Sequence, residues 1–186
     1  MLKKWMYSLF IVIVVVAFGY LLPNLFKPSL DTKSCAFCET SIVSRQKFYE
    51  DDFVIALYTH KPVVEAHFLI IPKRHIERFE MLSDEEVVQI NQVIKKVHQA
   101  SKETFGTESY LLLQKNGIEV GQTVPHVHIH YMGRKLGEDS TVKFMIKMLV
   151  APLLGPISLD QMAFLTKTMQ SAMQEDSYLE KRFSLN

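Results

Sequence analysis

A charge-free run near the amino terminus constrains this chain more than any other feature. Residues 5–22 read WMYSLFIVIVVVAFGYLL, which is 18 residues without a charge, and Lys3 and Lys4 precede them. Crossing a bilayer core as a helix takes roughly 20 apolar residues, and a helix in a soluble core normally keeps a polar side. The run therefore predicts an uncleaved transmembrane helix. The alternatives are a cleaved signal sequence and a buried core helix.

Lysines on both sides of this run bear on its orientation. Lys3 and Lys4 lie on one side, whereas Lys27 and Lys33 lie on the other. The first positive charges usually dominate membrane topology. We therefore expect residues 1–30 to be an anchor and linker in a bacterial inner membrane, with the rest of the chain outside the cytosol.

The charge balance limits the class of partner. The whole chain carries 21 basic and 20 acidic side chains, and residues 1–30 hold three of the basic ones and no acidic one. The remainder, with 18 basic against 20 acidic residues, lacks the surplus positive charge that nucleic-acid-binding domains use to neutralise phosphates. We therefore expect no nucleic-acid polymer as a partner.

The rest of the chain reads as an α+β domain. Ser83 and Glu86 form a capping box that predicts a helix to about Lys102, since apolar residues follow it at helical spacing. Several β-rich runs surround this helix, and they predict strands over Phe53–Tyr58, Ala66–Ile71, Tyr110–Gln114 and Thr123–Met132. Strands in succession with one inserted helix predict an antiparallel sheet with a helix packed on one face.

The pattern changes after Arg134. Residues 142–150 are apolar and rich in Met, and Pro152 and Pro156 then interrupt them. Ser158 begins a further helix whose apolar stripe contains Met162, Leu165, Met169 and Met173. Such a stripe predicts core or dimer packing, with a membrane or partner contact as the alternative. We therefore divide the chain, beyond the anchor, into residues 31–140, the main α+β domain, and residues 141–186, a helical carboxyl-terminal extension.

Three histidines at alternate positions carry the strongest functional signal. His126, His128 and His130 would share one face of a strand, while the apolar residues between them face a core. Clustered imidazoles repel each other when protonated and lose water when buried, so a purely structural role is a poor explanation. The row indicates either a metal site or nucleophilic catalysis on phosphorus by a neutral imidazole.

A glycine-containing loop precedes the row. Asn116-Gly117 and Gly121 predict a tight turn. We expect its backbone amides, together with Gln122 and Thr123, to face phosphate oxygens and a leaving group.

These residues resemble the histidine triad (HIT) superfamily of nucleotide hydrolases and transferases, in its Hint-like bacterial branch. The resemblance rests on the sequence GQTV at 121–124 followed by the histidine row, and on YEDD at 49–52, AHFLIIPKRH at 66–75 and LSDEE at 82–86. It covers about Cys35 to Arg134. It implies a HIT-like fold with a five-stranded antiparallel sheet, and a homodimer.

The resemblance also implies a two-step reaction. His128 would attack the α-phosphorus of a nucleoside phosphoramidate or a dinucleoside polyphosphate, and water would hydrolyse the nucleotidyl-histidine to a nucleoside monophosphate. The other implied positions are His130 near the α-phosphate, Gln122 at the phosphate, Thr123 near the leaving group and His67 in hydrogen-bonding support of the row. No catalytic metal is expected.

The chain departs from the Hint and Fhit branches at two positions. Thr59 stands where an Asp or Asn holds the ribose, and Lys115 stands where an Asn or Gln usually contacts the phosphate, a role that Asn116 could assume. We expect these residues and Gly121 to bind the nucleotide. The alternative is a membrane-tethered nucleotide-binding module with little turnover. A metal-dependent enzyme is disfavoured, because no acidic ligand lies close to the row in sequence.

Cys35 and Cys38 are the only cysteines. Their C-x-x-C spacing is compatible with zinc, a redox pair or a short disulfide. The resemblance implies zinc, because many bacterial family members add two histidines to this pair, here His75 and His126. A Cys2His2 set leaves no open coordination position, so the expected zinc is structural. A disulfide or free thiols remain the alternatives.

Overall fold

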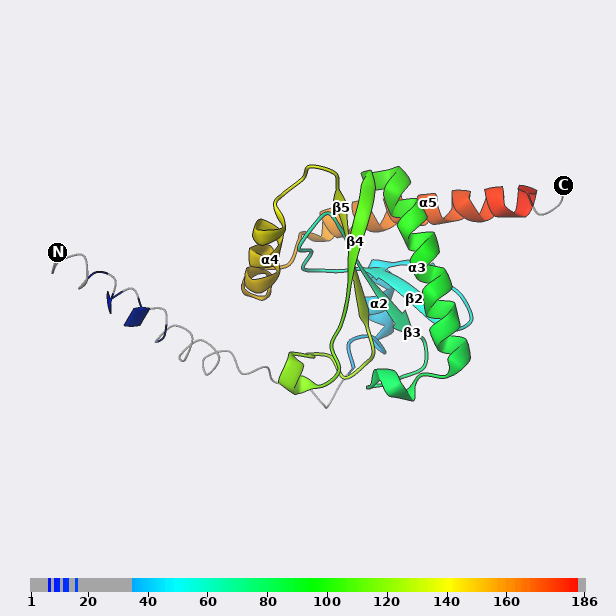
Figure 1. The fold of residues 1–186 in the computed structure, drawn as a ribbon. Coiled ribbons are helices and arrows are strands. Elements are labelled where there is room, and N and C mark those ends of the chain that lie inside the picture. The colour runs from blue at the N-terminus through cyan, green and yellow to red at the C-terminus, as the bar shows by residue number, and fades with distance from the viewer. Residues whose placement is uncertain (1–6, 8, 11, 14–15, 17–34, 184–186) are drawn as a thin grey trace.

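The computed structural model describes residues 35–183, together with residues 7, 9, 10, 12, 13 and 16 (Figure 1). Those six residues are helical. These six residues belong to the transmembrane helix predicted over residues 5–22. The rest of that helix, and with it most of the predicted anchor, lies outside the described residues. No helix in the described part of the chain is both long enough and apolar enough to span a bilayer.

The centre of the molecule is a five-stranded antiparallel sheet, which confirms the predicted α+β class. Its spatial order is β1-β2-β3-β5-β4, so β3 is the middle strand and β4 lies at an edge. The strands are β1 (Lys47–Glu50), β2 (Val54–Tyr58), β3 (Ala66–Pro72), β4 (Thr107–Gln114) and β5 (Ile129–Lys135).

The helices of the described part are α2 (Thr40–Gln46), α3 (Asp84–Phe105), α4 (Thr141–Val150) and α5 (Leu159–Phe183), with the short helices η1 (Phe79–Met81), η2 (Ile118–Val120) and η3 (Ala151–Leu153). The predicted capping box is confirmed, since the Ser83 hydroxyl accepts from the Glu86 amide and the Glu86 carboxylate accepts from the Ser83 amide. Helix α3 ends at Gly106, whose φ of 66° lies in the left-handed region that terminates helices.

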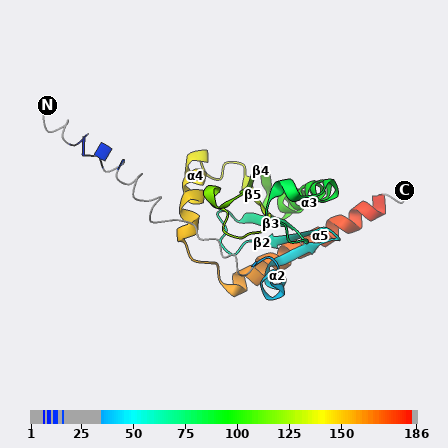
Figure 2. The ribbon, with the colours of Figure 1, turned by 90° about the horizontal axis from the view of Figure 1, so that it is seen from below.

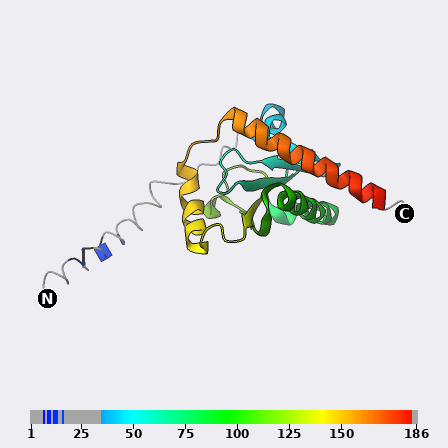
Figure 3. The ribbon, with the colours of Figure 1, turned by 90° about the horizontal axis from the view of Figure 1, so that it is seen from above.

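Helices α3 and α5 cover the same face of the sheet (Figure 2). The main hydrophobic core lies between them and the strands, with Phe68 and Tyr131 from the sheet and Val97 from α3 among its buried members. The apolar stripe of α5 joins this core, and its four residues Met162, Leu165, Met169 and Met173 are each at most 7% exposed. The predicted core packing of the stripe is thus confirmed, and Figure 3 shows α5 running across the sheet.

The opposite face of the sheet carries two smaller apolar clusters and leaves room for polar side chains. Leu57, Leu69 and Ile71 pack with Val43 of α2. Further along, a second cluster joins Val64, Met132 and Phe144, the last of them from α4. Between these clusters, the alternation of β3 and β5 leaves their histidines on this polar face.

The strand predicted over Thr123–Met132 is wrong in its first half. Strand β5 begins at Ile129 and runs to Lys135, and residues 123–128 lie outside any strand, with bends at 124–126. Pro125 has no amide hydrogen to donate to a ladder. The next two amides are bonded elsewhere, because His126 N–H donates to the Val124 carbonyl and Val127 N–H donates to the Ile76 carbonyl.

Candidate functional site

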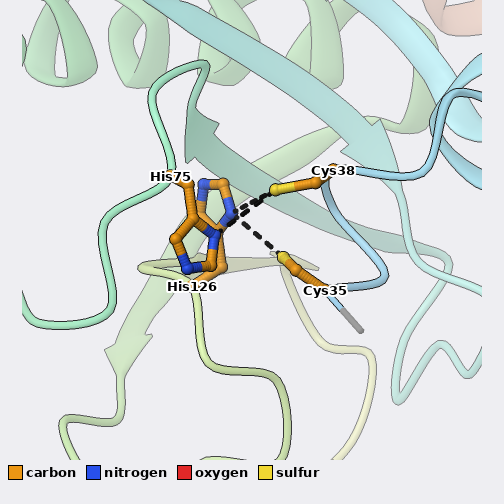
Figure 4. Close-up of side chains that lie close together, drawn as sticks. All are labelled: Cys35, Cys38, His75 and His126. Carbon is orange, nitrogen blue, oxygen red and sulfur yellow. Dashed lines mark hydrogen bonds between the residues drawn. The ribbon is translucent and has the colours of Figure 1, made fainter. Parts of the chain in front are cut away.

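Four side chains converge where the chain enters the described domain. Cys35 and Cys38 come from the turn before α2, His75 from the loop after β3, and His126 from the bend before β5 (Figure 4). Their ligand atoms all lie within 4.8 Å of one another. Cys35 Sγ and His126 Nδ1 are 3.3 Å apart, as are Cys38 Sγ and His75 Nδ1. The four predicted metal ligands are therefore brought together.

The hydrogen bonds of His126 prepare it as a ligand. Its Nε2 lies 2.9 Å from the Pro72 carbonyl, which only accepts, so this nitrogen carries the proton. The Nδ1 lone pair is then left for the two sulfur atoms. Burial lowers the pKa of His126 to about 4, although the Pro72 carbonyl acts in the opposite direction. The imidazole is therefore neutral, as metal binding requires.

The donor set fits a tetrahedral zinc ion. Zn–S bonds of about 2.3 Å and Zn–N bonds of about 2.0–2.1 Å place tetrahedral ligands some 3–4 Å apart, and the two 3.3 Å separations between sulfur and nitrogen lie in that range. Burial and the neighbouring Cys35 raise the pKa of Cys38 to about 11. A cysteine coordinates zinc as the thiolate, so metal binding at Cys38 would release a proton.

His128 lies beside this cluster and is oriented by it. Its Nδ1 is 2.7 Å from the backbone carbonyl of His126, so Nδ1 carries the proton and Nε2 keeps its lone pair. Burial lowers the pKa of His128, with a smaller contribution of the same sign from Lys115. A neutral imidazole with a free Nε2 is the form that acts as a nucleophile.

A chain of hydrogen bonds gives His130 the opposite tautomer to His128, with its proton on Nε2. The Val63 amide donates to His67 Nδ1 at 3.0 Å, so His67 Nε2 carries a proton. That nitrogen lies 2.9 Å from His130 Nδ1 and donates to it, which leaves the proton of His130 on Nε2. Burial lowers the pKa of His67 to about 4 and that of His130 to about 2. His130 is therefore a neutral N–H donor.

His128 and His130 thus offer complementary groups at one place. Their ring centroids lie 5.1 Å apart. One ring presents a lone pair and the other an N–H, which is the combination needed to attack an electrophile and to stabilise an oxygen on it. The predicted row is therefore formed, although only His130 belongs to a strand.

Phe37 is a site residue that the sequence reasoning did not single out. Its ring contacts His126 at 5.9 Å and His128 at 5.2 Å between centroids, in edge-to-face geometry. It occupies a middle position of the C-x-x-C turn, and this position in the motif is the sequence feature that could have identified it. The turn that holds two of the predicted metal ligands, Cys35 and Cys38, therefore also packs against the row.

Gln122 fixes the loop that precedes the row. Its Oε1 accepts from the Gly117 amide at 2.7 Å, and its Nε2 donates to the carbonyls of Glu77 and Val124. The side chain is buried. Gly117 and Gly121 have φ values of 118° and 81°, which explains glycine at both positions.

The remaining predicted nucleotide-binding residues differ in their surroundings. Lys115 Nζ lies 3.4 Å from the Gly121 carbonyl. Thr123 is exposed and makes no hydrogen bond within the described part of the chain. Thr59 is buried at the end of β2, where its amide donates to the His67 carbonyl. The amide group of Asn116 is used elsewhere, because it accepts from the Phe79 amide and donates to Glu80.

Comparison with known proteins adds a family match. A model of the HIT domain matches residues 41–137. An uncharacterized HIT-like protein of Methanocaldococcus jannaschii is 34% identical over 112 residues, which are 59% of this chain and 86% of that protein. A bifunctional bis(5'-adenosyl)-triphosphatase/adenylylsulfatase of Arabidopsis thaliana is 37% identical over 113 residues, which are 60% of this chain and 62% of the plant protein.

A solved structure supports the same architecture. The zinc-bound histidine triad family protein of Mycobacterium smegmatis superposes with a TM-score of 0.59, covering 78% of this chain and 97% of that one, at 24% identity. At this identity the likeness concerns the fold.

Proposed function

This chain belongs to the HIT-domain family, and from that premise we propose that it is a nucleotide hydrolase or transferase that cleaves at an α-phosphate. The substrate class is a nucleoside phosphoramidate or a dinucleoside polyphosphate. The plant relative is a bis(5'-adenosyl)-triphosphatase, which supports this class. The observation that carries the proposal is the 2.7 Å bond from His128 Nδ1 to the His126 carbonyl, because it leaves Nε2 as the nucleophile.

The reaction proceeds in two steps. His128 Nε2 forms a bond to the α-phosphorus while the bond from phosphorus to the leaving oxygen or nitrogen breaks. His130 Nε2–H donates a hydrogen bond to the phosphoryl group as charge develops there. Water then attacks the nucleotidyl-His128, which releases a nucleoside monophosphate and restores the free imidazole.

The loop before the row binds the anionic part of the substrate. Lys115 supplies positive charge beside Gly121. The free hydroxyl of Thr123 lies near the leaving group and is available to hydrogen-bond with it. Gln122 keeps the loop in shape through its backbone contacts. Thr59 lies at the sugar end, where its hydroxyl replaces the carboxylate or amide of the Hint and Fhit branches.

Cys35, Cys38, His75 and His126 hold a structural zinc ion, and no catalytic metal takes part. The ion supplies a cross-link between the amino-terminal turn and the bend before β5. The geometry and the neutral form of His126 described above support this proposal.

We place a second copy of the chain along β4. This strand is at the sheet edge, and Tyr110, Leu111 and Leu112 are 36–44% exposed on it. An edge strand with exposed apolar side chains is suited to pairing. Residues 5–22 anchor the protein in a bacterial inner membrane, with the domain outside the cytosol.

The test uses the full chain and an adenosine phosphoramidate. The wild-type protein releases AMP and yields a trapped nucleotidyl-histidine, with and without chelator present during the assay. The variant His128→Asn loses both signals, because its side chain offers no nucleophilic nitrogen. The matched control is His98→Asn on α3, where the imidazole bonds to the Tyr131 hydroxyl and not to the row.

Each outcome separates the candidate functions. Full activity in His128→Asn would disprove the nucleophile assignment. Tight nucleotide binding without AMP release from the wild-type protein would favour the binding module. Activity that depends on metal added at the histidine row would favour the metal-dependent enzyme.

A further inference from the structure

Helix α4 is apolar on the side that faces away from the protein. Val142, Met145, Ile146 and Leu149 follow the i, i+3, i+4, i+7 pattern of one helix face. Each is more than half exposed, and Leu149 reaches 78%. A surface helix normally turns such a stripe inward, whereas here the inward side is held by Phe144, which is 5% exposed.

The exposed stripe continues past the end of the helix. Leu153 and Leu154 in and after η3 are each 59% exposed. We call Val142, Met145, Ile146, Leu149, Leu153 and Leu154 the α4 face. Soluble monomers seldom expose a contiguous apolar surface of this kind without a partner for it.

Two lysines flank the α4 face. Lys143 and Lys147 both pair with Asp139, so they lie along the side of the helix and not on its apolar stripe. Lysine stems cover apolar surface while their ammonium groups reach polar surroundings. An apolar stripe bordered by lysines is the pattern of helices that lie in the interface of an anionic bilayer.

Helix α4 packs on the same face of the sheet as the start of the described domain. Phe144 packs on Met132 and Val64, on the sheet face that carries the histidine row. Phe37, at the start of the described domain, packs on the same face beside Leu57. Residues 23–36 separate Phe37 from the charge-free run, and 14 residues span at most about 50 Å.

We propose that the α4 face lies in the headgroup region of a phospholipid bilayer, so that the domain rests on the membrane surface with this side down. The charge-free run of residues 5–22 does not suit the α4 face as its occupant. A run apolar on all sides needs burial all round, and one face of a ten-residue helix covers only a fraction of it.

The first experiment asks whether lipid reaches Leu149. Trp5 is the only tryptophan, so Trp5→Phe removes the native fluorescence and Leu149→Trp adds one reporter to the full-length chain. The matched control is Val88→Trp on α3, a position 56% exposed on the other side of the sheet. Both proteins are reconstituted in phosphatidylcholine–phosphatidylglycerol vesicles, with and without brominated acyl chains.

We expect brominated lipid to quench the reporter at 149 several-fold more than the reporter at 88. Equal quenching at both positions would overturn the proposal. Blue-shifted emission at 149 without quenching would also overturn it, because that result means a protein partner or a second copy covers the face.

The second experiment needs no substitution. Met145 and Met81 are 56% and 58% exposed, on α4 and on η1 respectively. A charged, membrane-impermeant oxidant is added to the wild-type protein in the same vesicles, and mass spectrometry follows both sulfoxides. Met145 should oxidise several-fold more slowly than Met81, whereas equal rates would contradict lipid contact. Neither readout depends on catalysis, so both remain valid if the proposed hydrolase activity fails.

Discussion

At the scale of single residues, His126 connects the proposed metal ligands to the proposed nucleophile, His128. Its Nε2 donates to the Pro72 carbonyl, its Nδ1 faces the cysteines, and its backbone carbonyl accepts from His128. A displacement of this residue would therefore alter both the coordination geometry and the direction of the nucleophilic lone pair.

His67 makes the stability of the protein sensitive to acid. Its pKa is lowered from 6.5 to about 4 by burial, so between these pH values the unfolded chain binds a proton that the folded chain does not. The contribution of His67 to the free energy of unfolding is therefore constant above pH 6.5. It falls as the pH decreases below 6.5, by about 3 kcal/mol in total. We expect His67→Gln to flatten this part of the profile in denaturant titrations from pH 7 to pH 4. Parallel profiles for the two proteins would contradict the assignment.

The sequence predicted the identity of the site residues better than their contacts. The alternate histidines and the C-x-x-C pair are local patterns, and the structure brings these groups together. The distant partners of Gln122 and Asn116 were not predictable, because they include backbone groups at Glu77 and Phe79, about 40 residues earlier in the chain. The contact of Phe37 with His128 joins residues that are still farther apart in the sequence.

At the scale of elements, strong local sequence signals predicted helices and strands correctly, whereas weak signals did not. The capping box located the start of α3, and apolar runs located β2 and β3. Strand β1 was not predicted, because its four residues are KFYE and carry a charge at each end. Strand β5 begins late, since the amides of its predicted first half are bonded to other partners.

Gly133 allows close approach of three strands. A Cβ there would meet Thr107 Cγ2 at 2.7 Å and Ala66 Cβ at 3.1 Å. We expect Gly133→Ala to lower the free energy of unfolding by about 1–3 kcal/mol, because the added methyl overpacks the sheet. Gly155→Ala is the control, since nothing lies within 4 Å of its new Cβ. Chemical denaturation of both variants is the measurement, and equal stabilities would refute the packing argument.

At the scale of the whole molecule, the two faces of the sheet carry different groups. The α3–α5 side holds the main apolar core, whereas the other side holds the histidines and the proposed metal ligands. The extension after residue 140 contributes to both sides, through α5 in the core and α4 beside the row. Sequence patterns could locate these helices but not the side on which each packs.

Removal of zinc should affect the whole domain. A ligand that binds only the folded state stabilises it in proportion to the logarithm of its concentration over Kd, here about 3 kcal/mol or more for a tight site. We expect a strong chelator to lower the Tm of the wild-type protein and to leave Cys38→Ser, which has lost a ligand, nearly unchanged. Metal analysis should give one zinc per wild-type chain. An unchanged wild-type Tm after verified metal loss would contradict the structural role.

The middle strand has a consequence for how the molecule opens. All seven residues of β3 are buried, and β3 is paired on both sides, with β2 and with β5. Backbone amides in such a position exchange with solvent only when the molecule unfolds globally, whereas terminal helices and edge strands open more often. His67 and its partner His130 are therefore attached to the slowest-exchanging part of the protein. Partial opening at the periphery therefore leaves the contact between His67 and His130 in place.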